Sequence, residues 1–148
     1  VDKNNKQFKN KDDLLININR YFDYLLIKNM STLEESTKKD MLFEIYMARL
    51  DILNNHRSSI KNLMKYFLYK PQKLARLIPS FLETIILMAT NCKINIDGFS
   101  GIPKIKTMFI LYFLILYTWS KDETESLEKT MTTLDKYLNN IDKLIKIL

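Results

Sequence analysis

The chain has 148 residues, of which 47% are hydrophobic and 27% are charged, as expected for one globular domain. It contains only two glycines and three prolines, which are too few for the tight turns of an all-β fold or for a glycine-rich phosphate loop. The formal net charge of +6 comes almost entirely from lysine, whereas arginine is the residue favoured for bidentate phosphate and base contacts.

A first helix is predicted over residues 11–28, after a polar, aperiodic stretch at residues 1–10. Asn10 is a suitable N-cap, because its side-chain oxygen can accept a hydrogen bond from an unpaired amide of the first turn. Asp12 and Asp13 would lie in that turn, where negative charge suits the helix dipole.

Three further helices follow with short connections. The second is predicted over residues 37–54, with Thr37 as its cap and apolar residues on two faces, which favours a central position. The third, residues 56–69, has the i, i+3, i+4, i+7 apolar spacing of an amphipathic helix. Pro71 suits the first position of the fourth helix, predicted over residues 71–91.

The fifth helix is predicted to start near Gly101–Pro103 and to end at Ser120. Its ten consecutive apolar residues, 108–117, are too few to span a bilayer, so we expect no stable membrane insertion. The sixth helix is predicted from residue 123 to the C-terminus. Its apolar residues follow a heptad seam: Leu127, Met131, Leu134, Leu138, Ile141, Ile145 and Leu148.

These elements predict an all-α fold of about six helices, with one domain at residues 11–148. The last two helices have more apolar surface than one small core needs, which favours a homodimer over a monomer whose core they only cover. The candidate dimer residues are Ile110, Phe113, Leu114, Tyr117, Leu127, Met131, Leu134, Leu138 and Ile141.

A resemblance to a known family rests on six stretches in the right order. They are Phe-Lys-Asn-Lys-Asp-Asp-Leu-Leu (8–15), Leu-Phe-Glu-Ile-Tyr-Met-Ala-Arg-Leu-Asp-Ile-Leu (42–53), Asn-His-Arg (55–57), Ile-Asp-Gly-Phe-Ser-Gly (96–101), Trp-Ser-Lys-Asp-Glu (119–123) and Thr-Met-Thr-Thr-Leu-Asp-Lys-Tyr-Leu (130–138). The chain resembles the C-terminal, ligand-binding and dimerising part of TetR-type transcription regulators, in the branch related to the lipid-binding protein of ubiquinone biosynthesis.

The resemblance implies a sensor and dimerisation domain that binds a small apolar or amphipathic effector. In the family a helix-turn-helix domain precedes the first of these stretches, whereas here only seven residues precede Phe8. We therefore expect DNA binding only if such a domain is present in the full gene product.

Two alternatives stay open. One is a lipid or isoprenoid carrier of the ubiquinone-synthesis type, although its Asn-Trp-Tyr-Thr-Lys-Arg segment is absent near residues 103–107. The other is a structural partner that heterodimerises with an intact regulator.

Aromatic and methionine side chains on the middle helices suit an adaptable apolar pocket, and the alternative is plain core packing. Arg49 is a candidate for the polar end of a ligand, or for an ion pair at the helix surface. His56, followed by Arg57, is a candidate for the same contact or for a helix-junction role. The candidate pocket residues are Tyr46, Met47, Arg49, His56, Phe67, Phe81, Met88, Phe109 and Tyr112.

Catalysis and metal binding are not expected. One histidine and one cysteine cannot build a His/Cys zinc site, and the sequence offers no nucleophile–base pair. We therefore predict no enzyme activity and no cofactor. The lone Cys92 and the absence of a secretory signal favour a cytoplasmic location.

Overall fold

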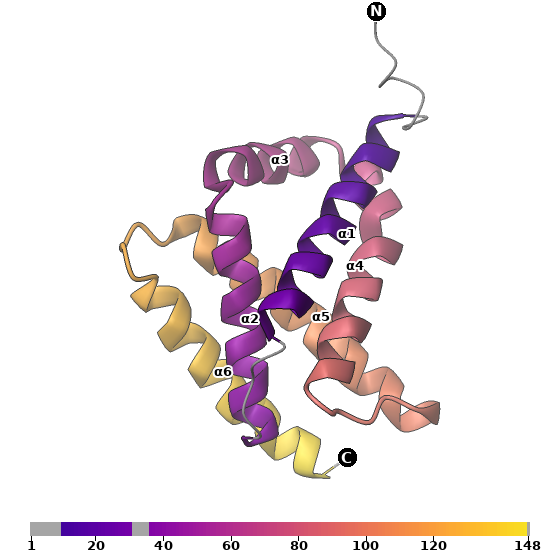
Figure 1. Cartoon of the computed structure of the whole chain (residues 1–148), viewed down its shortest axis with the longest axis vertical. Coiled ribbons are helices and arrows are strands. Elements are labelled where there is room, and N and C mark those ends of the chain that lie inside the picture. Colours follow the sequence, from indigo (N-terminus) through magenta and orange to yellow (C-terminus); the bar gives the residue numbers. More distant parts are fainter. Residues whose placement is uncertain (1–9, 31–35, 148) are drawn as a thin grey trace, which may run out of the picture.

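The computed structural model describes residues 10–30 and 36–147, and this part of the chain forms six α-helices and no strand (Figure 1). The helices are α1 (Lys11–Met30), α2 (Lys38–Asn54), α3 (Arg57–Tyr69), α4 (Pro71–Asn91), α5 (Gly98–Lys121) and α6 (Glu128–Ile147). The predicted all-α, six-helix fold is therefore confirmed, and α1 to α4 lie within two residues of their predicted bounds. Apart from Asn10, the polar stretch at residues 1–10 lies outside the described residues.

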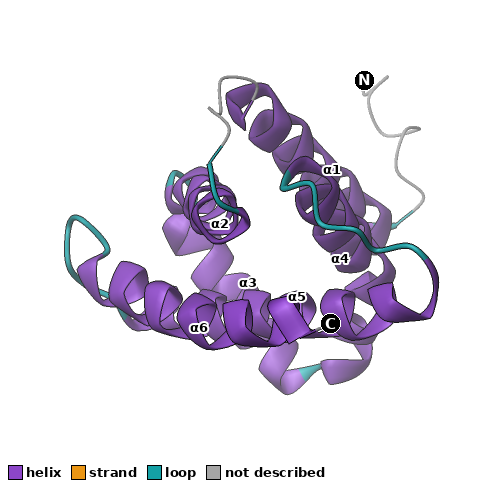
Figure 2. Ribbon diagram, turned by 90° about the horizontal axis from the view of Figure 1, so that it is seen from below, coloured by secondary structure: helices purple, strands orange, loops and turns teal. Residues whose placement is uncertain are grey.

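The helices pack in two layers. Figure 2 shows α5 and α6 along one side of the molecule and α1, α2 and α4 on the other. Within the second layer α1 contacts both α2 and α4, while α2 packs on α6 and α4 packs on α5. The short α3 lies across the top of the molecule in Figure 1 and contacts α2 and α4. Helix α3 therefore covers one end of the two layers.

Two helices begin at the caps that the sequence predicts. The Asn10 side-chain oxygen accepts a 2.9 Å hydrogen bond from the Asp13 amide. The Thr37 hydroxyl oxygen accepts one of 3.1 Å from the Asp40 amide and donates to the Asp40 carboxylate at 2.6 Å. Each cap satisfies an amide that has no partner within its own helix.

Helix α2, which the sequence predicts to be central, does lie in the centre of the fold. Its apolar residues face several directions, so α2 contacts α1, α3, α4, α5 and α6. A fully buried aliphatic side chain stabilises a fold by roughly 1.5–3 kcal/mol, which makes this helix a large contributor to the core. Its buried residues are Met41, Leu42, Ile45, Tyr46, Arg49, Leu50, Ile52 and Leu53.

The last two helices begin elsewhere than predicted. Helix α5 starts at Gly98 and accommodates Pro103 in its second turn, where the sequence suggested a start at 101–103. Helix α6 starts at Glu128, five residues after the predicted position. The charged segment before it suits a first helical turn by its sequence, but it forms a loop.

The carboxylate of Asp122 organises that loop. Its Oδ2 accepts hydrogen bonds of 2.8 Å from both the amide and the hydroxyl of Thr130, and its Oδ1 accepts from the amide and hydroxyl of Thr124. Burial alone would raise the pKa of Asp122, but these hydrogen bonds outweigh it and hold the pKa below its usual value. The Thr124 hydroxyl also accepts from the Glu128 amide, so the first turn of α6 is capped from the loop.

Candidate functional site

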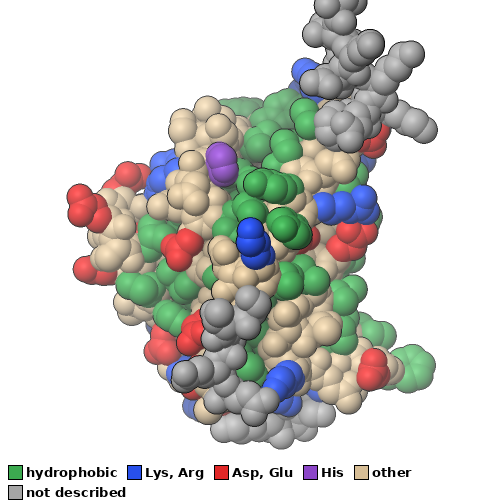
Figure 3. Space-filling model, in the orientation of Figure 1, with side chains coloured by type: hydrophobic (Ala, Val, Ile, Leu, Met, Phe, Trp, Pro, Cys, Tyr) green, Lys and Arg blue, Asp and Glu red, His purple; other side chains and the backbone are tan. Residues whose placement is uncertain are grey.

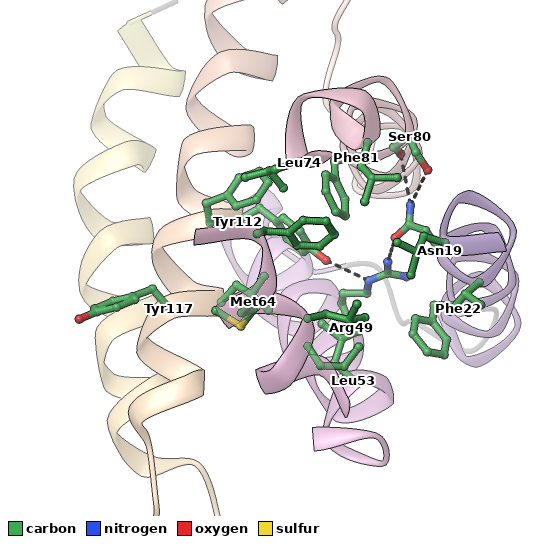
Figure 4. Close-up of a pocket in the computed structure, with 18 of the residues that line it drawn as sticks. Asn19, Phe22, Arg49, Leu53, Met64, Leu74, Ser80, Phe81, Tyr112 and Tyr117 are labelled. Carbon is green, nitrogen blue, oxygen red and sulfur yellow. Dashed lines mark hydrogen bonds between the residues drawn. The ribbon is translucent and has the colours of Figure 1, made fainter. Parts of the chain in front are cut away.

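A cavity of about 270 Å³ lies under α3, between α1, α2, α4 and α5 (Figure 4). Among the described residues that line it, only three are neither aliphatic, thioether nor aromatic: Asn19, Arg49 and Ser80. An apolar wall with a few grouped polar side chains is typical of small-molecule sites. The lining residues are Leu15, Ile18, Asn19, Phe22, Arg49, Leu53, Ile60, Leu63, Met64, Phe67, Leu68, Leu74, Leu77, Ser80, Phe81, Tyr112, Phe113, Leu116 and Tyr117.

The roof of the cavity is formed by α3. This helix is amphipathic, yet none of its residues is fully buried. Its four inward apolar side chains are half-buried and line the cavity: Ile60, Leu63, Met64 and Phe67. Leu68 stands at the rim and is 81% exposed. A surface helix normally buries its apolar stripe against the core, whereas the stripe of α3 stays half-buried and lines the cavity.

Arg49 is the centre of the polar end of the cavity. Its side chain is 1% exposed, and its Nη1 lies 2.8 Å from Oδ1 of Asp23. Its Nη2 donates to the side-chain oxygen of Asn19, and its Nε donates to the hydroxyl of Tyr112 at 3.3 Å. Figure 4 shows the guanidinium between these two partners. The expected ion pair at the helix surface is therefore wrong, because Arg49 pairs with Asp23 of α1 inside the protein.

Helix α4 completes this polar group. The Thr84 hydroxyl lies 3.0 Å from both carboxylate oxygens of Asp23 and donates to that group. The Asn19 amide nitrogen donates to the hydroxyl oxygens of Thr84 at 2.9 Å and Ser80 at 3.0 Å. Burial raises the pKa of Asp23, and the attraction of Arg49 and the Thr84 hydrogen bond oppose that rise. We name these six residues the Arg49 network: Asn19, Asp23, Arg49, Ser80, Thr84 and Tyr112.

Four of the nine sequence-predicted pocket residues line the cavity: Arg49, Phe67, Phe81 and Tyr112. The other five do not: Tyr46, Met47, His56, Met88 and Phe109. The cavity is confined to the end of the layers that α3 covers, and four of these five lie farther along α2, α4 and α5. Tyr46 is buried and donates to the Met108 carbonyl at 2.6 Å. His56 is exposed, purple in Figure 3, and its ring stacks on Phe22 at a centroid distance of 5.5 Å.

Sequence reasoning missed the contribution of α1. Leu15, Ile18, Asn19 and Phe22 follow the spacing of one helix face and together form a wall of the cavity. Asn19 is the polar member of this otherwise apolar face and is buried. A side-chain amide on an apolar stripe needs a buried hydrogen-bond partner. The position of Asn19 on this stripe was therefore the available signal that α1 carries part of a polar site.

Two of the stretches quoted for the family resemblance, residues 55–57 and 119–123, meet at the start of α3. Arg57 donates to the carbonyl oxygens of Trp119 (3.0 Å) and Asp122 and to the side chain of Asn54 at 3.2 Å. Its guanidinium stands 4.7 Å from the centre of the Trp119 ring, and the indole N–H donates to the same Asn54 oxygen at 3.1 Å. These contacts fix the start of α3 to the end of α5 and so hold the roof over the cavity.

The nine predicted dimer residues fall into three groups by exposure. Ile110, Leu114 and Tyr117 are exposed by 57%, 42% and 61% on the outer face of α5. Phe113 and Met131 are half-buried, and Phe113 lines the cavity. The other four are buried inside one chain, at 9% exposure or less: Leu127, Leu134, Leu138 and Ile141.

The assignment of these four heptad residues to a dimer surface is therefore corrected. The four buried residues of the seam belong to the core, because α6 turns this face toward α2 and α5, whereas Met131 is half-buried. The side chains of Ile145 and Leu148, at the end of the seam, lie outside the described residues.

No family model, no curated protein and no solved structure matches this chain. Two further observations bear on the class of site. Among the residues that the structure describes, no three histidine, cysteine, aspartate or glutamate side chains form a group that could hold a metal ion. By length and composition alone α4 and α5 are each apolar enough to cross a bilayer, a test that core helices of soluble proteins also pass.

Proposed function

We propose that this chain is the sensor and dimerisation domain of a TetR-like transcription regulator, located in the cytoplasm. The effector is a small apolar or amphipathic molecule that binds in the cavity under α3. The proposal assigns DNA reading to a helix-turn-helix domain outside these 148 residues. It rests on the sequence resemblance and on the cavity, and it gives the chain no catalytic role.

The observation that carries the proposal is the unfilled packing of α3. Its apolar stripe is only half-buried, and although Ile60 and Met64 pack against the core, the stripe also lines the cavity. A molecule that fills this space removes apolar surface from water on both sides, at roughly 25 cal/mol per Å². A lipid-binding accessory protein would use the same cavity. The regulator is favoured here because it also uses the exposed face of α5.

Helix α5 links the two parts of the proposed function. Tyr117 lines the cavity and is also 61% exposed on the outer face of α5, next to Leu114 and Ile110. A ligand in the cavity therefore touches the helix that carries the proposed dimer interface. Differential binding to two arrangements of α5 would shift their populations, which is what coupling between a sensor site and an interface requires.

The cavity is tested by filling it from its roof. In Met64→Trp the larger side chain occupies ligand space, whereas Asn62→Trp adds the same ring on the exposed side of α3. The probes are medium-chain ketones, esters and fatty acids and substituted aromatic compounds, measured by thermal unfolding. A probe at about 100 times its Kd stabilises the unaltered chain by about 2.7 kcal/mol. We expect at least a ten-fold weaker Kd in Met64→Trp and an unchanged Kd in Asn62→Trp. No stabilisation by any probe would contradict the proposal.

The dimer is tested on the outer face of α5. Burying Ile110, Leu114 and Tyr117, which are about half exposed, against a second copy stabilises the association by roughly half of the 1.5–3 kcal/mol that complete burial of a large apolar side chain contributes, before association costs. Leu114→Glu is therefore expected to give monomers in light scattering at micromolar concentration. Ile86→Glu, which alters an equally exposed apolar residue of α4, should stay dimeric. A monomeric unaltered chain, or a dimeric Leu114→Glu variant, would show that this face is not the interface.

A further inference from the structure

The acceptor atoms at the polar end of the cavity are already used. The side-chain oxygen of Asn19 accepts from Arg49, and the Asp23 carboxylate accepts from Arg49 and Thr84. The hydroxyl oxygens of Thr84 and Ser80 both accept from the Asn19 amide. A donor group on a ligand would therefore have to share an oxygen that already accepts a hydrogen bond.

Donor capacity remains at the same place. Tyr112 accepts from Arg49 and Ser80 accepts from Asn19, and neither hydroxyl donates to any residue that the structure describes. Three of the five N–H groups of Arg49 donate within the network. All three residues line the cavity. Their unused hydrogens favour a ligand atom that accepts hydrogen bonds.

The charge of this donor group is already balanced. The Arg49 guanidinium is buried, and its Nη1 lies 2.8 Å from a carboxylate oxygen of Asp23. A ligand carboxylate placed here would bring a second negative charge to one buried cation, and burying a charge without its own partner is costly. A ketone or ester oxygen accepts the same hydrogen bonds without that cost.

We infer that the cavity selects an uncharged amphiphile whose carbonyl or ester oxygen binds Tyr112, Ser80 and Arg49, and that Asp23 excludes its carboxylate analogue. This inference rests on the proposed function, because it specifies the ligand of the same cavity. The volume of about 270 Å³ lies just below the usual range of about 300–1,000 Å³ for ligand sites, so the apolar part of the ligand is short or monocyclic.

The test compares two probes of equal chain length, octan-2-one and octanoate, by calorimetric titration at about pH 7.5, where a carboxylic acid is ionised. We expect octan-2-one to bind the unaltered chain at least ten-fold tighter than octanoate. Tyr112→Phe removes one unused donor and should weaken octan-2-one several-fold. Equal or tighter binding of octanoate by the unaltered chain would overturn the inference while leaving the proposed cavity function intact.

A charge variant tests the cause of the selection. Asp23→Asn keeps the shape of the side chain but removes its charge, so the preference should move toward octanoate by at least ten-fold. Asp13→Asn removes a carboxylate from the first turn of the same helix and should leave the preference unchanged. An unchanged preference in Asp23→Asn would contradict the role of Asp23. If Asp23→Asn does not fold, the ranking of the two probes in the unaltered chain decides the inference. If the unaltered chain binds neither octan-2-one nor octanoate, that result contradicts the proposed function itself.

Discussion

Replacing Arg49 with methionine is expected to lower the free energy of unfolding by about 3–5 kcal/mol, because it leaves the buried Asp23 carboxylate without its cation. Urea denaturation measures the loss. The double variant Arg49→Met/Asp23→Leu removes both charges and should recover most of it, because two apolar residues need no partner. Arg20→Met on the same helix as Asp23 breaks an exposed pair with Glu83 and should cost only about 0–1 kcal/mol.

The loss in Arg49→Met should depend on pH. Burial raises the pKa of Asp23 in the folded chain, and Arg49 opposes this rise, so the pKa rises further when the cation is removed. A carboxyl group whose folded pKa lies above its unfolded value favours folding when protonated, and that stability is lost as pH rises through the folded pKa. The deficit should therefore be largest near neutral pH and shrink toward about pH 4. A deficit below about 1 kcal/mol at neutral pH would contradict the buried-pair interpretation.

Gly101→Ala is expected to be the other strongly destabilising change, by about 3 kcal/mol, at the upper end of the usual cost of overpacking. A Cβ atom at this position would stand 1.8 Å from the carbonyl oxygen of Ile96 and 2.3 Å from its carbonyl carbon. Because both are backbone atoms, the start of α5 must move away from the preceding loop. Thermal or urea unfolding measures the change.

A second glycine in the same turn provides the matched control. Gly98 has a φ of +63°, and no atom lies within 4 Å of the position that a Cβ atom would take there. Gly98→Ala therefore meets only the cost of a left-handed conformation, roughly 1–2 kcal/mol. If Gly101→Ala costs no more than Gly98→Ala, the close approach at Ile96 does not constrain this turn.

The helices were predictable from the sequence because local signals act within a few residues. Caps at Asn10 and Thr37 and the proline at position 71 fixed three starts to within a residue. The start of α6 was missed because the deciding contact, from Asp122 to Thr130, spans eight residues and competes with the acidic residues that also suit a first turn.

The cavity was only partly predictable, because it depends on how the helices meet. Residue type identified Phe67, Phe81 and Tyr112, but aromatic and methionine residues serve equally well as core, as Met88 does. The partner of Arg49 lies 26 positions earlier in the chain, on a helix that sequence reasoning had not placed at the site. Likewise, no periodicity distinguishes a seam that packs inside one chain from a seam between two.

The most direct test of ligand binding under α3 uses the methionine methyl groups, of which the chain has seven. In a ¹³C-methyl NMR titration with octan-2-one, the signal of Met64 should shift and show contacts to the ligand, because Met64 lines the cavity. Met88 and Met108 are buried outside it and should stay unchanged. Shifts at Met88 and Met108 without a shift at Met64, or no shift at any methionine with saturating ligand, would contradict a binding site under α3.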